Sequence, residues 1–249
     1  MRPIQFTKMQ GLGNDFIVLD GPMQLGGHEV AEWCDRRLGI GADGVLVVSN
    51  GDPIHMEYWN ADGSAAEMCG NGLRCIARYA YDKGWAPDRN FTIQTAVGVR
   101  GVRVFEDRVE AELGRPHLQG TRVFDGVDYE LVDMGNPHAV TFVDDPGQVD
   151  VSAVGRSLQP EFPNGANIEF AARDGDGVTM RVWERGVGET LACGTGIAAV
   201  AAVAADRFDL AGPVVVSSPG GAASVDFREG VAWIKGPAEY SFRGSVGER

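Results

Sequence analysis

Two cysteines, Cys69 and Cys193, are each followed by a Gly-x-Gly pattern and then by an apolar segment. A cysteine at the start of a helix lies among backbone N–H groups that have no partner within the helix, and beside the positive end of the helix dipole. These groups favour the thiolate. We therefore predict a lowered pKa for both thiols and a role for each as a general base near neutral pH. The same N–H groups can bind a carboxylate, which would place a substrate anion beside the base.

The two cysteine motifs belong to a longer internal repeat. The segment Met56–Asn60 precedes Cys69 as Met180–Glu184 precedes Cys193, and the Met, Trp, Cys and both Gly residues align at an offset of 124 residues. Chance similarity between Gly-rich turns can explain one such match. A second match in the same order makes chance a poor explanation for both.

The second match joins Gly13-Asn14 to Gly135-Asn136, at an offset of 122 residues. We therefore predict two similar domains. The first covers residues 1–115 and carries Cys69; the second covers residues 116–249 and carries Cys193, with roughly the last ten residues able to return to the first domain. The boundary is expected in the polar stretch 114–120.

A helix is predicted directly after each of the two cysteines. After Cys69, apolar residues recur at helical spacing, and the segment 197–205 after Cys193 is apolar on all sides, as in a helix enclosed by its sheet. A further helix is expected over residues 29–38. The remaining regular segments alternate or are β-branched, which predicts strands over 91–95, 97–105, 108–113, 178–183, 214–218 and 231–235. The expected fold class is α+β, with two pseudo-symmetric β-rich domains, each a curved sheet around a central helix, and the active site in the cleft between them.

Two thiols presented by duplicated domains would suit the inversion of a carbon centre. One base removes a proton from one face of the carbon while an acid supplies a proton to the other face, and a thiolate and a thiol can exchange these roles. We therefore interpret Cys69 and Cys193 as an acid/base pair.

Composition excludes several other classes of protein. The chain has 249 residues and a formal net charge of −13, with 44% hydrophobic residues. An acidic chain lacks the basic face that phosphate backbones require, so nucleic acid is not an expected partner. No apolar run is long enough to span a bilayer, and no signal peptide is recognisable, so we expect a cytoplasmic protein with no membrane partner. The four cysteines are interpreted as reduced thiols rather than as a disulfide framework.

Five segments together carry a family resemblance. They are KMQGLGNDF (8–16), NADGSAAEMCGNGLRC (60–75), MGNPHAV (134–140), NGANIEF (164–170) and WERGVGETLACGTG (183–196). Along its full length the chain resembles the diaminopimelate epimerases. The resemblance implies pyridoxal-independent conversion of L,L- to meso-diaminopimelate, which serves the synthesis of lysine and peptidoglycan precursors, and a homodimer.

The resemblance also implies the site residues. It places the catalytic pair at Cys69 and Cys193, with supporting roles near the thiols for His138 and Glu184. Substrate contacts are implied for Asn14, Asn60, Gly70, Asn71, Asn136, Asn167, Glu184, Arg185, Gly194 and Thr195.

The repeat helps to interpret these implied contacts. Asn60 and Glu184 each lie nine residues before their cysteine, so both are expected to reach the α-amino group. The backbone amides at Gly70-Asn71 and Gly194-Thr195 are expected to bind the α-carboxylate.

Arg185 breaks the repeat, because its first-half equivalent is Ala61. A planar guanidinium suits the distal carboxylate of a substrate with two unlike ends. Asn14, Asn136 and Asn167 are expected to complete this distal site. Some family members have a substrate-contacting Gln where this chain has Gly44, so that contact is not expected here.

Other interpretations are weaker. No cofactor is expected, because none of the three lysines lies in a motif for a pyridoxal Schiff base and the glycines do not form a nucleotide fingerprint. No metal site is expected, since the histidines lack ligand spacing. The alternatives are a proline or hydroxyproline racemase, disfavoured by Arg185, a phenazine-type isomerase of the same fold, disfavoured by the intact cysteine pair, and a binding module without turnover.

Overall fold

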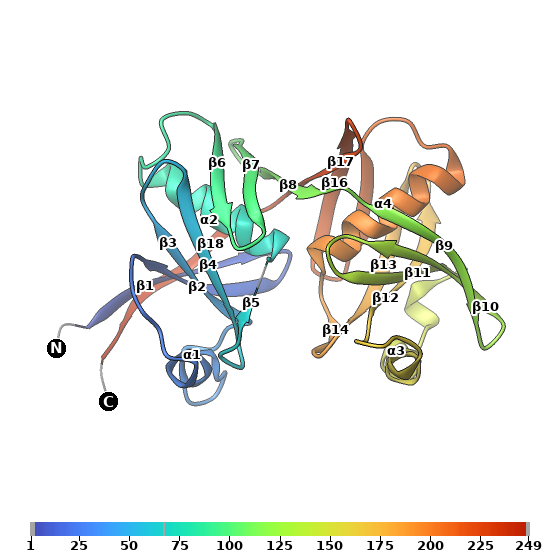
Figure 1. Ribbon diagram of the computed structural model, residues 1–249, viewed down its shortest axis with the longest axis horizontal. Helices are drawn as coiled ribbons and strands as arrows, with labels where there is room; N and C mark the ends of the chain where they lie inside the picture. The colour runs from blue at the N-terminus through green and yellow to red at the C-terminus, as the bar shows by residue number, and fades with distance from the viewer. Residues whose placement is uncertain (1–2, 67, 248–249) are drawn as a thin grey trace. The chain divides into compact units, whose positions relative to one another are not determined.

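The structure is a computed structural model that describes residues 3–66 and 68–247 (Figure 1). By their contacts the residues divide into two units. Unit 1 comprises Met1–Ala111 and Gly236–Arg249, and unit 2 comprises Glu112–Lys235. Each unit is rich in strands and contains one long helix that starts directly after one of the two cysteines of the sequence repeat.

Unit 1 is a mixed sheet that curves around helix α2 (Gly70–Asp82). The β1–β2 pair is antiparallel, β2–β3 parallel, β3–β4 antiparallel and β4–β6 parallel, and β6, β7 and β8 continue as an antiparallel meander. The last strand of the chain, β18, returns to pair with β1. The strands are β1 (Ile4–Gly11), β2 (Asn14–Asp20), β3 (Gly44–Ser49), β4 (Ile54–Asn60), β5 (Ala65–Ala66), β6 (Asn90–Thr95), β7 (Gly98–Val104), β8 (Val109–Gly114) and β18 (Glu239–Val246).

Unit 2 repeats this topology around helix α4 (Gly194–Phe208). The β10–β11 pair is antiparallel, β11–β12 parallel, β12–β13 antiparallel and β13–β15 parallel, and β15, β16 and β17 follow as an antiparallel meander. The strands are β9 (His117–Phe124), β10 (Val127–Asp133), β11 (Pro137–Phe142), β12 (Asn167–Asp174), β13 (Gly177–Glu184), β14 (Gly188–Thr190), β15 (Val214–Ser218), β16 (Gly221–Arg228) and β17 (Val231–Gly236). Two short 3₁₀ helices, Pro146–Gln148 and Gln159–Glu161, flank helix α3 (Val151–Leu158).

The predicted fold class is therefore confirmed. All six strands expected from sequence are present, and both helices after the cysteines form. Helix α4 extends further than its apolar core predicts, and from Ile197 to Ala204 no residue is more than 7% exposed. No helix among the described residues is long and apolar enough to cross a membrane.

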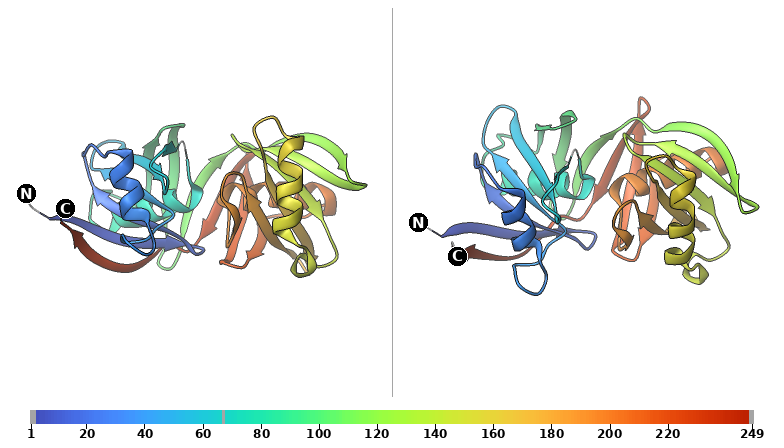
Figure 2. Two further views of the ribbon diagram at one scale, coloured as in Figure 1. Left: turned by 90° about the horizontal axis from the view of Figure 1, so that it is seen from below. Right: turned by 60° about the horizontal axis from the view of Figure 1, so that its bottom comes forward.

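Strands β2 and β3 are buried on both faces, which explains their continuous apolar sequences. Ile17 and Val47, on one face, pack in a cluster with Val30 and Trp33 of helix α1 (Gly27–Cys34), the blue helix in Figure 2. On the other face, Leu46 lies against the first turn of α2 at Gly72. Because successive side chains along a strand point to opposite faces of the sheet, alternate residues pack against α1 and against α2.

Strands β11 and β12 have the same arrangement in unit 2. Ile168 and Phe170 pack in a cluster with Val151 and Leu158 of α3. Glu169 lies between them in the sequence and therefore faces α4 instead, where it contacts the first turn of that helix. Each long helix therefore lies on one face of its sheet, and the parallel strand pair beneath it supplies residues to the cysteine turn.

The predicted helix over residues 29–38 is wrong at its end. Helix α1 stops at Cys34, because Asp35 takes an extended conformation and its carboxylate accepts hydrogen bonds from the backbone N–H groups of Arg37 and Leu38, at 2.7 Å each. Aspartate often terminates a helix in this way, by offering the backbone a local turn. The apolar spacing alone did not reveal this competition.

Candidate active site

Cys69 is the N-cap of α2. Its backbone is extended, and its Sγ accepts a hydrogen bond from the backbone N–H of Gly72 at 3.4 Å. Its Sγ also lies 3.4 Å from Oδ1 of Asn14. The sequence assigns Asn14 to the distal end of the substrate, whereas its carboxamide here lies directly beside the thiol.

The carboxamide of Asn14 is fixed by its neighbours. Its Nδ2 donates to Oδ2 of Asp43 at 2.7 Å, and its Oδ1 accepts from Nδ2 of Asn71 at 3.3 Å. Asp43 is in turn held by the guanidinium of Arg36, at 2.6 Å. A carboxylate can only accept hydrogen bonds, so this contact orients the amide group with its oxygen towards Cys69 and Asn71.

Arg74 lies beneath the same turn of α2 and is completely buried. Its Nη2 donates to Oδ1 of Asn71 at 2.8 Å, its Nη1 to the carbonyl oxygen of Gly70 at 3.3 Å, and its Nε to the carbonyl oxygen of Pro237 at 3.3 Å. All three acceptors are neutral. Among the described residues, Arg74 has no ion pair.

Cys193 is the N-cap of α4, and its surroundings in unit 2 are different. Its Sγ lies 3.5 Å from Oγ1 of Thr195, which accepts a hydrogen bond from Nδ2 of Asn136 at 3.3 Å. Asn136 thus lies at the cysteine turn, as its repeat equivalent Asn14 does in unit 1. The carboxylate of Glu184 acts on the thiol through its charge, and it accepts a short hydrogen bond from the hydroxyl of Thr190.

His138 and Glu169 form a buried pair below the Cys193 turn. His138 Nδ1 lies 2.6 Å from Glu169 Oε1, and neither side chain is exposed. The other ring nitrogen of His138 lies 3.1 Å from Oδ1 of Asn136. A hydrogen-bonded chain therefore runs from Glu169 through His138, Asn136 and Thr195 to Cys193. The second carboxylate oxygen of Glu169 has no hydrogen-bond partner among the described residues.

The structure corrects the predicted lowering of the Cys193 pKa. Burial raises the pKa of Cys193 well above its usual value, and the nearby charges of Glu184 and Glu169 raise it further. Hydrogen bonds from Thr195 and from the backbone of Gly196 act in the opposite direction but are weaker. Burial likewise raises the pKa of the Glu184 carboxyl. A helix N-terminus favours a thiolate, but desolvation beside two carboxylates outweighs it here.

The other predicted contact residues lie at helix starts and at strand ends. Gly70 and Gly194 are the first residues of α2 and α4. Asn60 ends β4, where its Nδ2 donates to the hydroxyl of Ser64 at 3.0 Å. Asn167 is buried, and its Oδ1 accepts a hydrogen bond from the backbone N–H of Arg185 at 2.9 Å.

The side chain of Arg185 is exposed and forms no ion pair with any described residue. Its aliphatic part lies beside Gly165, where an added Cβ would come within 3.1 Å of Cγ of Arg185. No carboxylate among the described residues therefore competes with an external anion for this guanidinium. Asn167 fixes the backbone at this point, so it positions Arg185 even without touching a ligand.

Gly44 is the ladder equivalent of Asn167. Gly44 pairs with Phe16 across β2–β3, as Asn167 pairs with His138 across β11–β12. A Cβ at Gly44 would lie 2.5 Å from the carbonyl oxygen of Trp59 and 2.7 Å from Cε2 of Tyr58. A larger residue at this position would have to displace this backbone.

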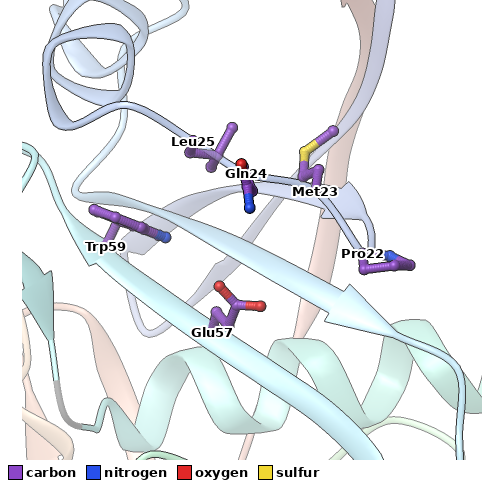
Figure 3. Close-up of a pocket in the computed structure, with 6 residues that line it drawn as sticks. All are labelled: Pro22, Met23, Gln24, Leu25, Glu57 and Trp59. Atoms are coloured by element: carbon purple, nitrogen blue, oxygen red, sulfur yellow. The ribbon is translucent and has the colours of Figure 1, made fainter.

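A separate hollow in unit 1 has a volume of about 610 Å³ (Figure 3). None of the predicted site residues lines it; its walls are Pro22, Met23, Gln24, Leu25, Glu57 and Trp59. Within the described part of the chain, no group of three or more His, Cys, Asp or Glu residues is placed to hold a metal ion.

Three site residues are not predicted from the sequence: Asp43, Arg74 and Glu169. Arg74 and Glu169 each interrupt an apolar segment, and their repeat equivalents are Ala198 and Leu46. A charged residue at an otherwise apolar position of a repeat was the available signal. Cys34 and Cys75, by contrast, are buried packing residues, and burial raises their pKa values to about 11 and about 12.

Comparison with known proteins adds independent evidence. The model of the diaminopimelate epimerase family matches residues 6–119 and 130–240. A diaminopimelate epimerase of Methanocella arvoryzae is 37% identical over 99% of this chain and 98% of its own length.

Two solved structures share the fold at low identity. A phenazine biosynthesis protein of the PhzF family from Enterococcus faecalis has a TM-score of 0.79 at 12% identity, covering 99% of this chain and 100% of its own. A hydroxyproline epimerase from Agrobacterium vitis has a TM-score of 0.75 at 16% identity, covering 99% and 91%. At such identities the likeness establishes the fold alone. The family match and the sequence identity over nearly the full length decide the assignment: this chain belongs to the diaminopimelate epimerase family and is an amino-acid epimerase.

Proposed function

We propose that this enzyme interconverts L,L- and meso-diaminopimelate without pyridoxal, using Cys69 and Cys193 as its acid/base pair. The observation that carries the proposal is the placement of these two cysteines at equivalent N-caps of α2 and α4, each beside the equivalent asparagine, Asn14 or Asn136. A duplicated frame with a thiol at the same point in both copies is what a two-base inversion requires.

In the proposed reaction, a thiolate on one cysteine removes the α-proton and becomes a thiol. The resulting carbanion takes a proton on its opposite face from the thiol of the other cysteine, which becomes the thiolate. One C–H bond breaks, one forms, and the reverse reaction exchanges the two roles. The raised pKa of Cys193 makes it the thiol, and hence the proton donor, when the cycle starts from free enzyme.

The substrate would be held by its charged groups. The first backbone N–H groups of α2 and α4 would bind the α-carboxylate, since helix N-termini favour anions. Asn60 and Glu184 would bind the α-ammonium group. The exposed guanidinium of Arg185, which has no ion pair with described residues, would take the distal carboxylate as a bidentate partner.

The two likenesses to solved structures do not separate the diamino acid from proline derivatives as substrates. Arg185 does so in our proposal, because a substrate without a distal carboxylate would leave its charge unused. We expect the product to serve lysine and peptidoglycan precursor synthesis, and we expect a homodimer, which sedimentation velocity would test.

The experiment is exchange of the substrate α-hydrogen in deuterium oxide, followed by NMR, with purified protein and no added cofactor. We expect incorporation with diaminopimelate and none with proline, trans-4-hydroxyproline or ornithine. Cys69→Ala and Cys193→Ala should each reduce epimerisation by about 10²-fold or more, the usual scale for removing a general acid or base. Unchanged rates in both variants would refute the two-thiol mechanism, and a faster reaction with a proline substrate would refute the substrate.

A further inference from the structure

We propose that Arg74 is a positioning residue that holds the Cys69 thiol in its ionised form at the start of the reaction cycle. The inference rests on the proposed function in assigning proton transfer to Cys69. It adds the group that decides which of the two thiols is the resting base.

The first step is the burial of an uncompensated cation. Among the described residues, Arg74 is the largest fully buried side chain, and the acceptors of its hydrogen bonds there are the neutral oxygens of Gly70, Asn71 and Pro237. Buried charges are normally paired, because an isolated ion in a protein interior is costly. An arginine cannot relieve this cost by losing its proton. A negative charge at the α2 turn would therefore be strongly favoured.

The second step identifies where that negative charge resides. Burial lowers the pKa of Arg74, and the groups whose negative charge would raise it again are the thiols of Cys75 and Cys69. Burial raises the pKa of Cys75 to about 12, so this thiol stays protonated. Of these two described groups, Cys69 is the one that can act as the counter-ion. It is also the less buried of the two, and its Sγ already accepts a backbone hydrogen bond from Gly72.

The third step is the connection between the two groups. Nη2 of Arg74 bonds Oδ1 of Asn71, Nδ2 of Asn71 bonds Oδ1 of Asn14, and this oxygen lies beside the sulfur of Cys69. The carboxamide oxygen of Asn14 by itself favours the protonated thiol. The full charge of Arg74, acting in an interior of low polarisability, is the stronger influence.

Other charged groups around α2 have partners of their own. Lys8 of β1 pairs with Asp15 of β2 at 2.6 Å, and Glu239 of β18 accepts from Gln10 at 2.7 Å. His55 and Glu57 of β4 are exposed. Further described charged groups on the packed elements and their loops include Asp20, Arg36, Asp43, Asp52, Asp62, Arg78, Asp82, Lys83, Arg100, Arg103, Glu106, Asp107, Arg108 and Arg243. None of these groups forms an ion pair with Arg74.

Unit 2 supplies the internal comparison. The repeat equivalent of Arg74 is Ala198, so α4 has no cation at this point. The charges that raise the pKa of Cys193 are the carboxylates of Glu184 and Glu169, and Glu169 is paired with His138. A cation behind one thiol and anions around the other would place the shared negative charge on Cys69.

The test measures alkylation of Cys69 by iodoacetamide between pH 5 and 9, read by peptide mapping of the full-length protein. Turnover is not needed, so a negative result here leaves the proposed function standing. We expect the wild-type midpoint to lie below about 8.5, the value for an ordinary thiol. Arg74→Gln or Arg74→Met should raise the midpoint by about one pH unit or more, which slows alkylation at pH 7 by about tenfold. Arg74→Lys, which keeps the charge, should restore most of the difference.

Arg78→Gln is the matched control. Arg78 lies one turn further along α2 and bonds the backbone carbonyls of Phe105, Glu106 and Arg108, so its loss should leave the Cys69 profile unchanged. An unchanged midpoint in a folded neutral variant of Arg74 would overturn the proposal. If no neutral variant folds, a wild-type midpoint at or above that of an ordinary thiol would overturn it equally.

Discussion

Beneath the cysteine turn of unit 1 lie Phe16 and Leu46, and at the equivalent positions of unit 2 lie His138 and Glu169. The frame is the same in both units. A parallel strand pair runs under the first turn of the long helix, and the cysteine is the N-cap. An asparagine at or just before the start of the first strand contacts the cysteine turn. Duplication has kept the backbone and changed the side chains that determine charge.

The charges differ in kind as well as in position. Unit 1 carries a buried guanidinium that does not titrate, whereas unit 2 carries a buried histidine–carboxylate pair and a second carboxylate, Glu184. Two identical thiols would share a negative charge equally. A symmetric backbone can therefore place a buried cation near one thiol and carboxylates near the other.

The largest effect is expected when the residues beneath the cysteine turn of unit 2, which we call its lining, are replaced by those of unit 1. We expect the double variant His138→Phe, Glu169→Leu to lose about 10²-fold or more in kcat, because it removes His138 and Glu169 from the hydrogen-bonded chain that leads to Cys193. Its free energy of unfolding should stay the same or rise by about 1–4 kcal/mol, since apolar residues of similar volume often replace a buried ion pair without loss. Steady-state kinetics and urea unfolding measure the two effects.

The single variant Glu169→Leu separates the two effects. It leaves Nδ1 of the buried His138 without its acceptor and should lower the free energy of unfolding by about 1–3 kcal/mol. A double variant that retains full activity would show that the polar pair beneath Cys193 contributes only to packing.

The second prediction concerns the reactivity of Cys193. Because burial and two carboxylates raise its pKa, we expect alkylation of Cys193 at pH 7 to be at least about tenfold slower than that of Cys69. Glu184→Gln removes one of the two charges and should shift the Cys193 profile to lower pH. Glu189→Gln is the control, since Glu189 pairs with Arg181 at 2.6 Å and does not act on the thiol. Equal profiles for the two cysteines would contradict the asymmetry.

These predictions draw on features that the sequence reveals unevenly. The apolar spacing after Cys69 predicted α2 because such spacing is local, and the repeat predicted its equivalent, α4. Glu169 was missed because one carboxylate in a strand is usually on a solvent face. Only the parallel register of β11 on β12, which pairs His138 with Asn167, places Glu169 under the cysteine turn. That pairing joins segments about 30 residues apart through α3, and no local pattern encodes it.

The pKa of Cys193 could not be predicted for a related reason. The position of a cysteine at a helix start is visible in sequence and favours the thiolate. How completely the surrounding sheet encloses that thiol depends on tertiary packing, and here enclosure dominates. The environment of Arg74 could not be predicted either. The sequence shows a charged residue within a helix, but it does not show that the acceptors of its hydrogen bonds are all neutral.

The third prediction tests the ion pairs that hold Asn14 in unit 1. Burial acts to raise the pKa of Asp15, but the hydrogen bonds and charges of Arg36 and Lys8 together lower it. Because the folded-state pKa lies below the unfolded one, ionised Asp15 stabilises the fold fully above about pH 4. This contribution is lost as the pH falls through the lowered pKa.

We expect Asp15→Asn to lower the free energy of unfolding by about 1 kcal/mol at pH 7, after allowing for solvent screening of a partly exposed pair, and by less at pH 3. Urea unfolding at the two pH values measures the difference. Asp107→Asn serves as the control, because that side chain is 80% exposed. A loss of equal size at both pH values would show that the charge of Asp15 is not responsible.

The smallest effect is expected at the glycines that meet the two linings. A Cβ at Gly72 would lie 3.2 Å from Cδ2 of Leu46, a flexible apolar end that can move aside. Gly72→Ala should therefore change the free energy of unfolding by less than about 1 kcal/mol, because the better helix propensity of alanine offsets the slight crowding. At Gly196 the same Cβ would lie 2.6 Å from Oε1 of Glu169, the atom that His138 bonds. Gly196→Ala must displace that carboxylate and should reduce both stability and kcat. Thermal unfolding and steady-state kinetics of the two variants measure these effects. Equal losses of stability and kcat in both variants would mean that the side chain of Glu169 moves aside as readily as that of Leu46.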